Sequence, residues 1–186
     1  FREALEGAAD AGGLLAYNHL AGEPIAGLDA GRPLFVRTPD STLSLANVMR
    51  AQLYGVFGTL ALGMQVLDGE GVALDRMYAH GGMFRTAGVA QRFLAAALNA
   101  PVAVGDTASE GGPWGMAVLA AFRRAVAASA GADADVTLGG YLDETVFARS
   151  AASIVDPDPA DVAGFADYLI RYRAGLAVEA AAVAHL

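Results

Sequence analysis

Short strand-like runs alternate with helix-like segments over residues 76–128, and a glycine-rich turn follows each run. The first run, residues 76–79, precedes His80-Gly81-Gly82, and the second, residues 101–104, precedes a glycine-rich turn over residues 109–115. This alternation is typical of an α/β layer, in which parallel strands end at one edge and ligands bind there. We therefore expect both turns to emerge side by side.

Capping residues and helical spacing predict where several helices begin and which faces they bury. Asp40, Ser41 and Thr42 are expected to supply the N-cap of a long helix, and Thr86 that of the helix after the first turn. Asp158 followed by Pro159 predicts the start of the last helix. The expected buried face of the long helix comprises Leu45, Val48, Met49, Leu53, Val56, Phe57, Leu60, Met64 and Leu67, and that of the last helix Val162, Phe165, Tyr168, Leu169, Tyr172 and Leu176.

Short sequence patterns predict two extended segments, a surface connection and a helical turn in the rest of the chain. Residues 14–17 take on extended character, and residues 34–37 form a short strand. Residues 127–135 are low in complexity and are expected to connect elements at the surface, before a helical turn that carries Val146 and Phe147. No internal repeat is visible.

Composition excludes several classes of protein. The chain has no cysteine, which rules out a disulfide scaffold, a thiolate metal site and a cysteine nucleophile, and which fits a cytoplasmic protein. A net charge of −8 without a basic patch argues against nucleic-acid binding. The longest apolar stretch, residues 56–67, is interrupted by glycine and polar residues, so no membrane span is expected. The chain begins with Phe1, and we expect a piece of a longer protein.

The glycine turns carry the chemistry. Gly81 and Gly82 let backbone approach a ligand, and N–H groups at a following helix N-terminus favour phosphate. The turn at residues 109–115 offers small residues against which a flat ring such as adenine fits. The alternative is a tight turn at Gly81-Gly82 and close helix–strand packing through Gly115. Neither turn is a Walker A loop or a GxGxxG motif, which argues against P-loop enzymes and ordinary Rossmann dehydrogenases.

His80 and Trp114 lie beside these turns, and each has a structural interpretation that needs no ligand. His80 follows a strand, where a histidine commonly bonds to nearby backbone, and Trp114 stands at a helix start, where it commonly packs in the core. Contact of His80 with phosphate and stacking of Trp114 on adenine are the functional alternatives. Three scattered histidines do not predict a metal site.

Several motifs in order resemble the FGGY family of carbohydrate kinases, closest to its ribulokinase-like and xylulokinase-like pentulose kinases. The resemblance covers roughly residues 1–128 and extends more loosely to the tail. It is carried by residues 13–18 (GLLAYN), 31–39 (GRPLFVRTP), 45–50 (LANVMR), 80–86 (HGGMFRT) and 110–117 (EGGPWGMA).

The resemblance implies a fold class, α/β, as part of a ribonuclease H-like C-terminal domain of the actin/hexokinase/Hsp70 ATPase type, with extra C-terminal helices. Residues 1–186 would form part of that nucleotide-binding domain, with a core at residues 1–130 and a helical extension at residues 131–186. It implies ATP and Mg²⁺ in a cleft between this domain and an N-terminal domain. Gly81 and Gly82 would line the ribose and α-phosphate, and the loop at residues 38–42 would face the phosphates less directly. The residues that would line the adenine and ribose are Gly111, Gly112, Gly115 and Met116.

The same resemblance implies ATP-dependent phosphorylation of a pentulose such as ribulose or xylulose by the parent enzyme. The catalytic Asp and the sugar-binding residues of the family lie upstream and match nothing here, so we expect no catalytic residue in this chain and no activity from it alone. The expected partners are ATP or ADP, the sugar, the N-terminal domain and, through the long apolar helices, a second copy. The alternatives are a regulatory or scaffold domain that binds nucleotide without kinase activity, and an unrelated α/β binding module.

Overall fold

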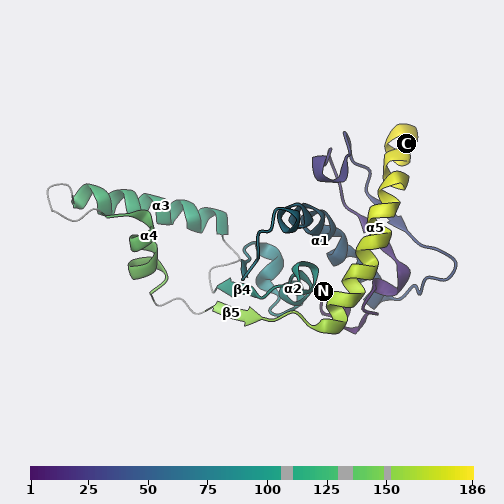
Figure 1. Ribbon diagram of the computed structural model, residues 1–186, viewed down its shortest axis with the longest axis horizontal. Coiled ribbons are helices and arrows are strands. Elements are labelled where there is room, and N and C mark those ends of the chain that lie inside the picture. The colour runs from purple at the N-terminus through teal and green to yellow at the C-terminus, as the bar shows by residue number, and fades with distance from the viewer. Residues whose placement is uncertain (106–110, 130–135, 149–151) are drawn as a thin grey trace.

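The chain folds as a mixed helical and stranded body, described here by a computed structural model for residues 1–105, 111–129, 136–148 and 152–186. Figure 1 shows α1 and α2 at the centre, α5 along one side, and α3 with α4 projecting away from the body. The α-helices are α1 (Leu45–Gly69), α2 (Val89–Leu98), α3 (Gly111–Ala128), α4 (Leu138–Tyr141) and α5 (Pro159–His185). The short helical turns are η1 (Arg2–Glu6), η2 (Ala11–Gly13), η3 (Pro24–Ala26), η4 (Gly82–Arg85) and η6 (Leu142–Val146).

Two small sheets hold the strands. β1 (Leu15–Tyr17) pairs antiparallel with β2 (Leu34–Val36). In the other sheet the order is β3-β4-β5, with β3 (Met77–Tyr78) parallel to β4 (Val102–Gly105) and β5 (Ala152–Val155) antiparallel to β4. The parallel pair β3–β4, joined through α2, confirms the strand–helix–strand prediction. β5 was not predicted, because its four residues carry no run of large apolar side chains beyond Ile154 and Val155.

The core lies between α1, α2, α5 and β1. Tyr54 of α1 packs edge-on against Phe93 of α2 and against Phe165 and Tyr168 of α5, with ring centroids 4.9–5.6 Å apart. All four side chains are buried. As predicted, Asp158 caps α5 with Pro159 in its first turn, and Phe165, Tyr168, Leu169 and Tyr172 are buried on one face of that helix.

The buried face of α1 differs from the prediction. Leu53 and Phe57 are buried, but Leu45, Val56, Leu60 and Leu67 are exposed. Small residues select the buried face, because they let neighbouring elements approach closely: a Cβ on Gly55 would lie 2.4 Å from the Ala16 carbonyl oxygen, and one on Gly58 would lie 2.9 Å from the Tyr172 ring. Hydrophobicity alone does not report such close approaches.

Two of the predicted helix caps are also wrong. Ser44 caps α1 by accepting from the Asn47 N–H, because the backbone of Thr42 is already engaged by Gly12 and by the Asn47 side chain. Thr86 closes η4 in an extended conformation, and Gly88, with φ of 80°, precedes α2 in its place.

In the part of the chain that projects from the body, the bounds of two predicted segments differ from the structure. The predicted turn at residues 109–115 is already helical from Gly111, and residues 106–110 lie outside the described residues. Of the predicted surface connection, residues 127 and 128 complete α3, and residues 130–135 lie outside the described residues. The helical turn that carries Val146 is confirmed as η6.

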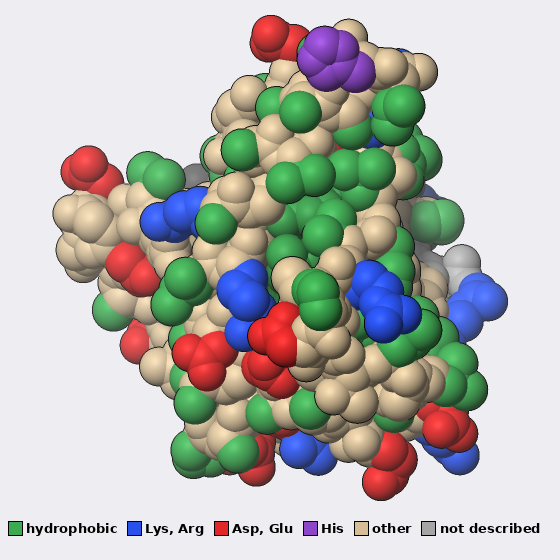
Figure 2. Space-filling model, turned by 90° about the vertical axis from the view of Figure 1, so that its right-hand side faces the viewer, with side chains coloured by type: hydrophobic (Ala, Val, Ile, Leu, Met, Phe, Trp, Pro, Cys, Tyr) green, Lys and Arg blue, Asp and Glu red, His purple; other side chains and the backbone are tan. Residues whose placement is uncertain are grey.

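Charged side chains gather on the face that lies to the right in Figure 1. Figure 2 views this face and shows acidic and basic side chains next to one another around its middle, beside apolar surface. No helix among the described residues is long and apolar enough to cross a membrane.

Candidate functional site

The parallel strands β3 and β4 deliver two chain segments to one edge of their sheet. Their pairing continues past β3, since the Ala79 N–H donates to the Ala103 carbonyl at 2.9 Å. His80 and Gly81 follow directly. Gly81 has φ of 120°, a conformation that side chains rarely adopt, and this explains why glycine stands there.

The start of α3 lies against this segment. A Cβ on Gly111 would lie only 2.7 Å from the Cβ of His80, so the absence of a side chain allows the two segments to meet. The His80 and Trp114 rings are stacked, with centroids 6.3 Å apart and an interplanar angle of 18°. Trp114 also contacts Phe147 of the η6 segment, with ring centroids 5.8 Å apart.

Together these segments line a cavity of about 390 Å³, within the ordinary size range of small-molecule sites. The lining residues are His80, Gly81, Gly111, Gly112, Pro113, Trp114 and Gly115. Four of the six glycine and methionine positions named from the sequence are therefore brought together: Gly81, Gly111, Gly112 and Gly115. Gly82 lies one residue outside the lining, in η4, and Met116 is exposed and is not among the lining residues.

The sequence argument gave too little weight to two of the lining residues. Trp114 is half-buried in the cavity wall and not in the core, and His80 lies beside it. The available signal was the position of Trp114 itself, directly after a glycine pair and Pro113, at a helix start.

The cavity suits a planar ring and an anion. Gly112 and Gly115 have no atom within 4 Å of the place a Cβ would occupy, so they leave a flat surface free of side chains. Among the described residues α3 begins at Gly111, and the helix dipole places partial positive charge toward this end. None of the described residues that line the cavity is acidic.

The other predicted residues lie elsewhere. The loop at residues 38–42 lines a separate groove with Asp10 and Arg171 and shares none of its described residues with the cavity. Its expected approach to the phosphates stays a prediction. The described residues contain no group of three or more His, Cys, Asp or Glu side chains that could hold a metal ion.

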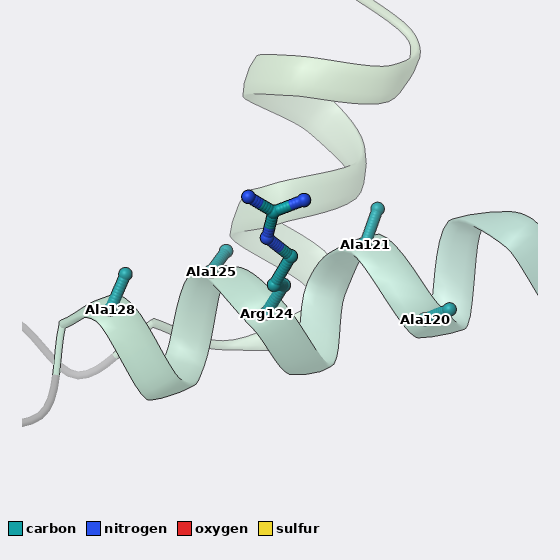
Figure 3. A pocket seen from close by; sticks show the side chains of 5 residues that line it. All are labelled: Ala120, Ala121, Arg124, Ala125 and Ala128. Carbon is teal, nitrogen blue, oxygen red and sulfur yellow. The ribbon is translucent and has the colours of Figure 1, made fainter.

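A hollow on α3 is not a second candidate. Its lining residues, Ala120, Ala121, Arg124, Ala125 and Ala128, all belong to one helix, and Figure 3 shows four alanine methyl groups around a single guanidinium. A surface of this kind offers one charged group and no converging partner.

The fold is a mixed helix and sheet arrangement, with a glycine-lined cavity at the end of a parallel strand pair. The family described as "FGGY family of carbohydrate kinases, C-terminal domain" matches residues 1–124. The chain therefore belongs to the FGGY family of carbohydrate kinases, as part of its C-terminal domain. None of the curated protein sequences matches the chain.

Solved structures of sugar kinases share the fold. Xylulose kinase from Rhodospirillum rubrum is 27% identical, with a TM-score of 0.65 over 95% of this chain and 32% of that one. Gluconate kinase from Lactobacillus acidophilus is 20% identical, with a TM-score of 0.68 over 95% and 34% of the two chains. Ligand-bound xylulose kinase from Lactobacillus acidophilus is 19% identical, with a TM-score of 0.69 over 97% and 35%. The chain spans about a third of the length of each of these proteins.

Proposed function

We propose that this chain supplies the nucleotide-binding part of an ATP-dependent kinase that phosphorylates a pentulose such as xylulose or ribulose. The observation that carries the proposal is the cavity in which His80-Gly81 and the start of α3 meet. Membership of a carbohydrate kinase family supports phosphoryl transfer. Two of the similar structures are described as xylulose kinases, which favours a pentulose over the gluconate of the third.

Within the cavity, each group has a role in this proposal. Gly111, Gly112 and Gly115 give the adenine and ribose a surface without side chains, and Trp114 offers a ring face for stacking. Gly81 and Gly82 receive the ribose and α-phosphate, near the N-terminus of α3. Met116 was assigned to the adenine by resemblance and would have to turn inward from its exposed position to reach it.

The chemistry follows from what these residues can do. Phosphoryl transfer depends mainly on positioning and charge stabilisation, and ATP brings the transferred group. The lining residues hold and orient the nucleotide, while the catalytic Asp and the sugar contacts come from the rest of the parent enzyme. Mg²⁺ would be held mainly through the nucleotide and that missing part, because no carboxylate is among the described residues that line the cavity.

The missing part also has a place to pack. Val56 and Leu60 on α1, and Met116 and Leu119 on α3, are exposed apolar side chains. Large apolar side chains that are left exposed on a helix suit packing against another part of a protein. We propose that the N-terminal portion of the parent covers some of these side chains, and that the β3–α2–β4 unit belongs to a ribonuclease H-like sheet completed by that portion.

The test is titration of ATP into the parent enzyme and into the chain, by calorimetry. Gly115→Val should weaken ATP binding about tenfold or more, equivalent to ~1.4 kcal/mol or more, while leaving the fold intact because its Cβ meets no atom within 4 Å. Gly69→Val is the matched control, since Gly69 is also helical and open but lies at the end of α1. Failure of the parent to bind ATP would overturn the proposal. ATP binding without pentulose phosphorylation would favour the regulatory or scaffold alternative.

A further inference from the structure

A groove of about 610 Å³ lies on the side of the molecule away from α3, between the N-terminal segment, the β2–α1 loop and α5. Its lining residues are Ala8, Asp10, Gly12, Gly13, Leu15, Val36, Arg37, Thr38, Asp40, Ser41, Thr42, Arg171 and Ala174. No residue of the nucleotide cavity belongs to it.

Hydrogen bonds brace the walls of the groove against one another. The Asn47 side chain accepts from the Ala8 N–H and donates to the Thr42 carbonyl, both at 2.8 Å. The Thr42 N–H donates to the Gly12 carbonyl at 2.9 Å. The Asp10 carboxylate accepts from the Gly12 N–H at 2.9 Å. The walls are thus held in place before any ligand arrives, which reduces the entropy cost of binding.

Opposite charges compensate one another along the groove. The Arg171 guanidinium donates to the Asp10 carboxylate at 3.0 Å and to the Asp10 carbonyl at 2.9 Å. A hydrogen bond from the Thr38 side chain, with a smaller contribution from Arg171, lowers the pKa of Asp40. The lining holds Asp10 and Asp40 against Arg37 and Arg171, so its formal charge is zero. A bare anion would meet two carboxylates and a bare cation two guanidiniums.

Free donors and acceptors remain after this pairing. The Arg171 Nε is buried and has no hydrogen-bond partner among the described residues. Arg37, Asp40 and the Thr42 side chain are exposed at the rim. Leu15, Val36 and Ala174 add apolar surface, and Gly12 and Gly13, with φ of 61° and 77°, expose backbone without a Cβ.

We propose that this groove binds a small, neutral, polyhydroxylated compound. A hydroxyl group both donates and accepts, so it can bridge a carboxylate and a guanidinium that lie side by side. The C–H groups of such a compound can rest on the apolar floor at Leu15 and Val36. The Asp10 carboxylate already pairs with the Arg171 guanidinium at 3.0 Å, so neither group is free to hold one charge of a zwitterion.

The test uses xylitol as the probe and the chain without nucleotide, followed by NMR of the backbone amides. Saturable shifts confined to residues of the groove, among them Gly12, Gly13 and Thr42, are expected. Asp40→Asn should weaken xylitol binding about tenfold, and Arg37→Gln by a similar factor, since each removes one charge-assisted hydrogen bond. Both side chains are exposed, so neither change endangers folding.

Matched controls separate this site from other effects. Asp29→Asn and Arg173→Gln alter exposed side chains outside the groove and should leave xylitol binding unchanged. Gly115→Val should also leave it unchanged, so failure of the nucleotide proposal would not carry this one with it. The proposal is overturned by an absence of saturable shifts, by tighter binding of phosphate or alanine than of xylitol, or by equal losses in the control variants.

Discussion

The guanidinium of Arg50 lies 3.1 Å from the carboxylate of Asp161, although 111 residues separate the two in the chain. Both side chains are almost completely buried. Arg50 also donates to the Ala4 and Leu5 carbonyls and lies 4.7 Å from the centroid of the Phe93 ring. One side chain on α1 thereby joins η1, α2 and α5.

Replacement of this residue, Arg50→Met, should destabilise the chain by about 3–5 kcal/mol, because it leaves buried carbonyls and a buried carboxylate short of donors. Arg92→Met, which removes the half-exposed second partner of Asp161, should cost only about 1 kcal/mol. Urea unfolding followed by circular dichroism measures both values. A stability of Arg50→Met within about 0.5 kcal/mol of the parent chain would show that the ion pair contributes nothing to stability.

A second buried pair ties the loop after β1 to the far half of α5. The Glu179 side chain is fully buried and accepts from His19 Nδ1 at 2.9 Å and from the Arg32 N–H at 3.3 Å. The other nitrogen of the ring, Nε2, lies 3.0 Å from the Thr59 hydroxyl. A carboxylate only accepts, so the proton of a neutral His19 belongs on Nδ1.

Glu179→Gln should therefore cost about 1–3 kcal/mol, since an amide keeps the shape but presents one acceptor and one poorly placed donor. The loss should be local, with faster amide hydrogen exchange at Arg32 and neighbouring residues. Glu70→Gln changes an exposed side chain at the end of α1 and serves as the control. Unchanged exchange at Arg32 would argue against the role given to this carboxylate.

Two glycines of α1 should respond to alanine with opposite signs. A Cβ on Gly55 would lie 2.4 Å from the Ala16 carbonyl, whereas one on Gly63 would make an ordinary contact with Ile25 at 3.9 Å. Gly55→Ala should destabilise by about 1–3 kcal/mol through overpacking. Gly63→Ala should stabilise by about 0.5–1 kcal/mol, because alanine favours the helix. Thermal unfolding of the two variants measures the difference, and a shift of the same sign in both would contradict the close packing of α1 on β1.

The sequence predicted the helices and strands better than it predicted which residues pack against one another. Alternation of strand and helix predicted the parallel pair β3–β4, and Asp158-Pro159 predicted the start of α5. The buried face of α1 was missed because it is set by Gly55 and Gly58, whose importance depends on what packs against them.

In the candidate site, too, individual residues were predicted from the sequence, but the contacts between distant segments were not. The glycines of both turns were found from their spacing along the chain, and four of them line one cavity. The stacking of His80 on Trp114 depends on the approach of two segments that only the tertiary fold brings together. The position of the loop at residues 38–42 in a groove of its own likewise depends on the tertiary fold, which binds the Thr42 backbone to Gly12, 30 residues earlier in the chain.

Buried tyrosines should make the chain sensitive to alkaline pH. Burial raises the pKa of Tyr54 from 10.0 to about 12, with a nearby Arg50 opposing and Asp161 adding to the effect. Burial also raises the pKa values of Tyr17, Tyr168 and Tyr172. The neutral phenol is favoured in the folded state, so this stabilisation is complete below pH 10 and is lost as the pH rises towards 12.

For Tyr54 alone the loss amounts to about 3 kcal/mol. Phenolate absorbance and the helical circular dichroism signal should therefore change together in one cooperative transition above pH 10. Tyr54→Phe removes the ionisation together with the hydrogen bond to the Ala9 carbonyl, so it should lower stability at neutral pH by about 1 kcal/mol and move the alkaline transition upward. Tyr78→Phe removes an exposed phenol and should leave the transition in place. A gradual rise in phenolate absorbance with the helical signal intact would mean that these tyrosines ionise without unfolding the core, contrary to their burial between α1, β1 and α5.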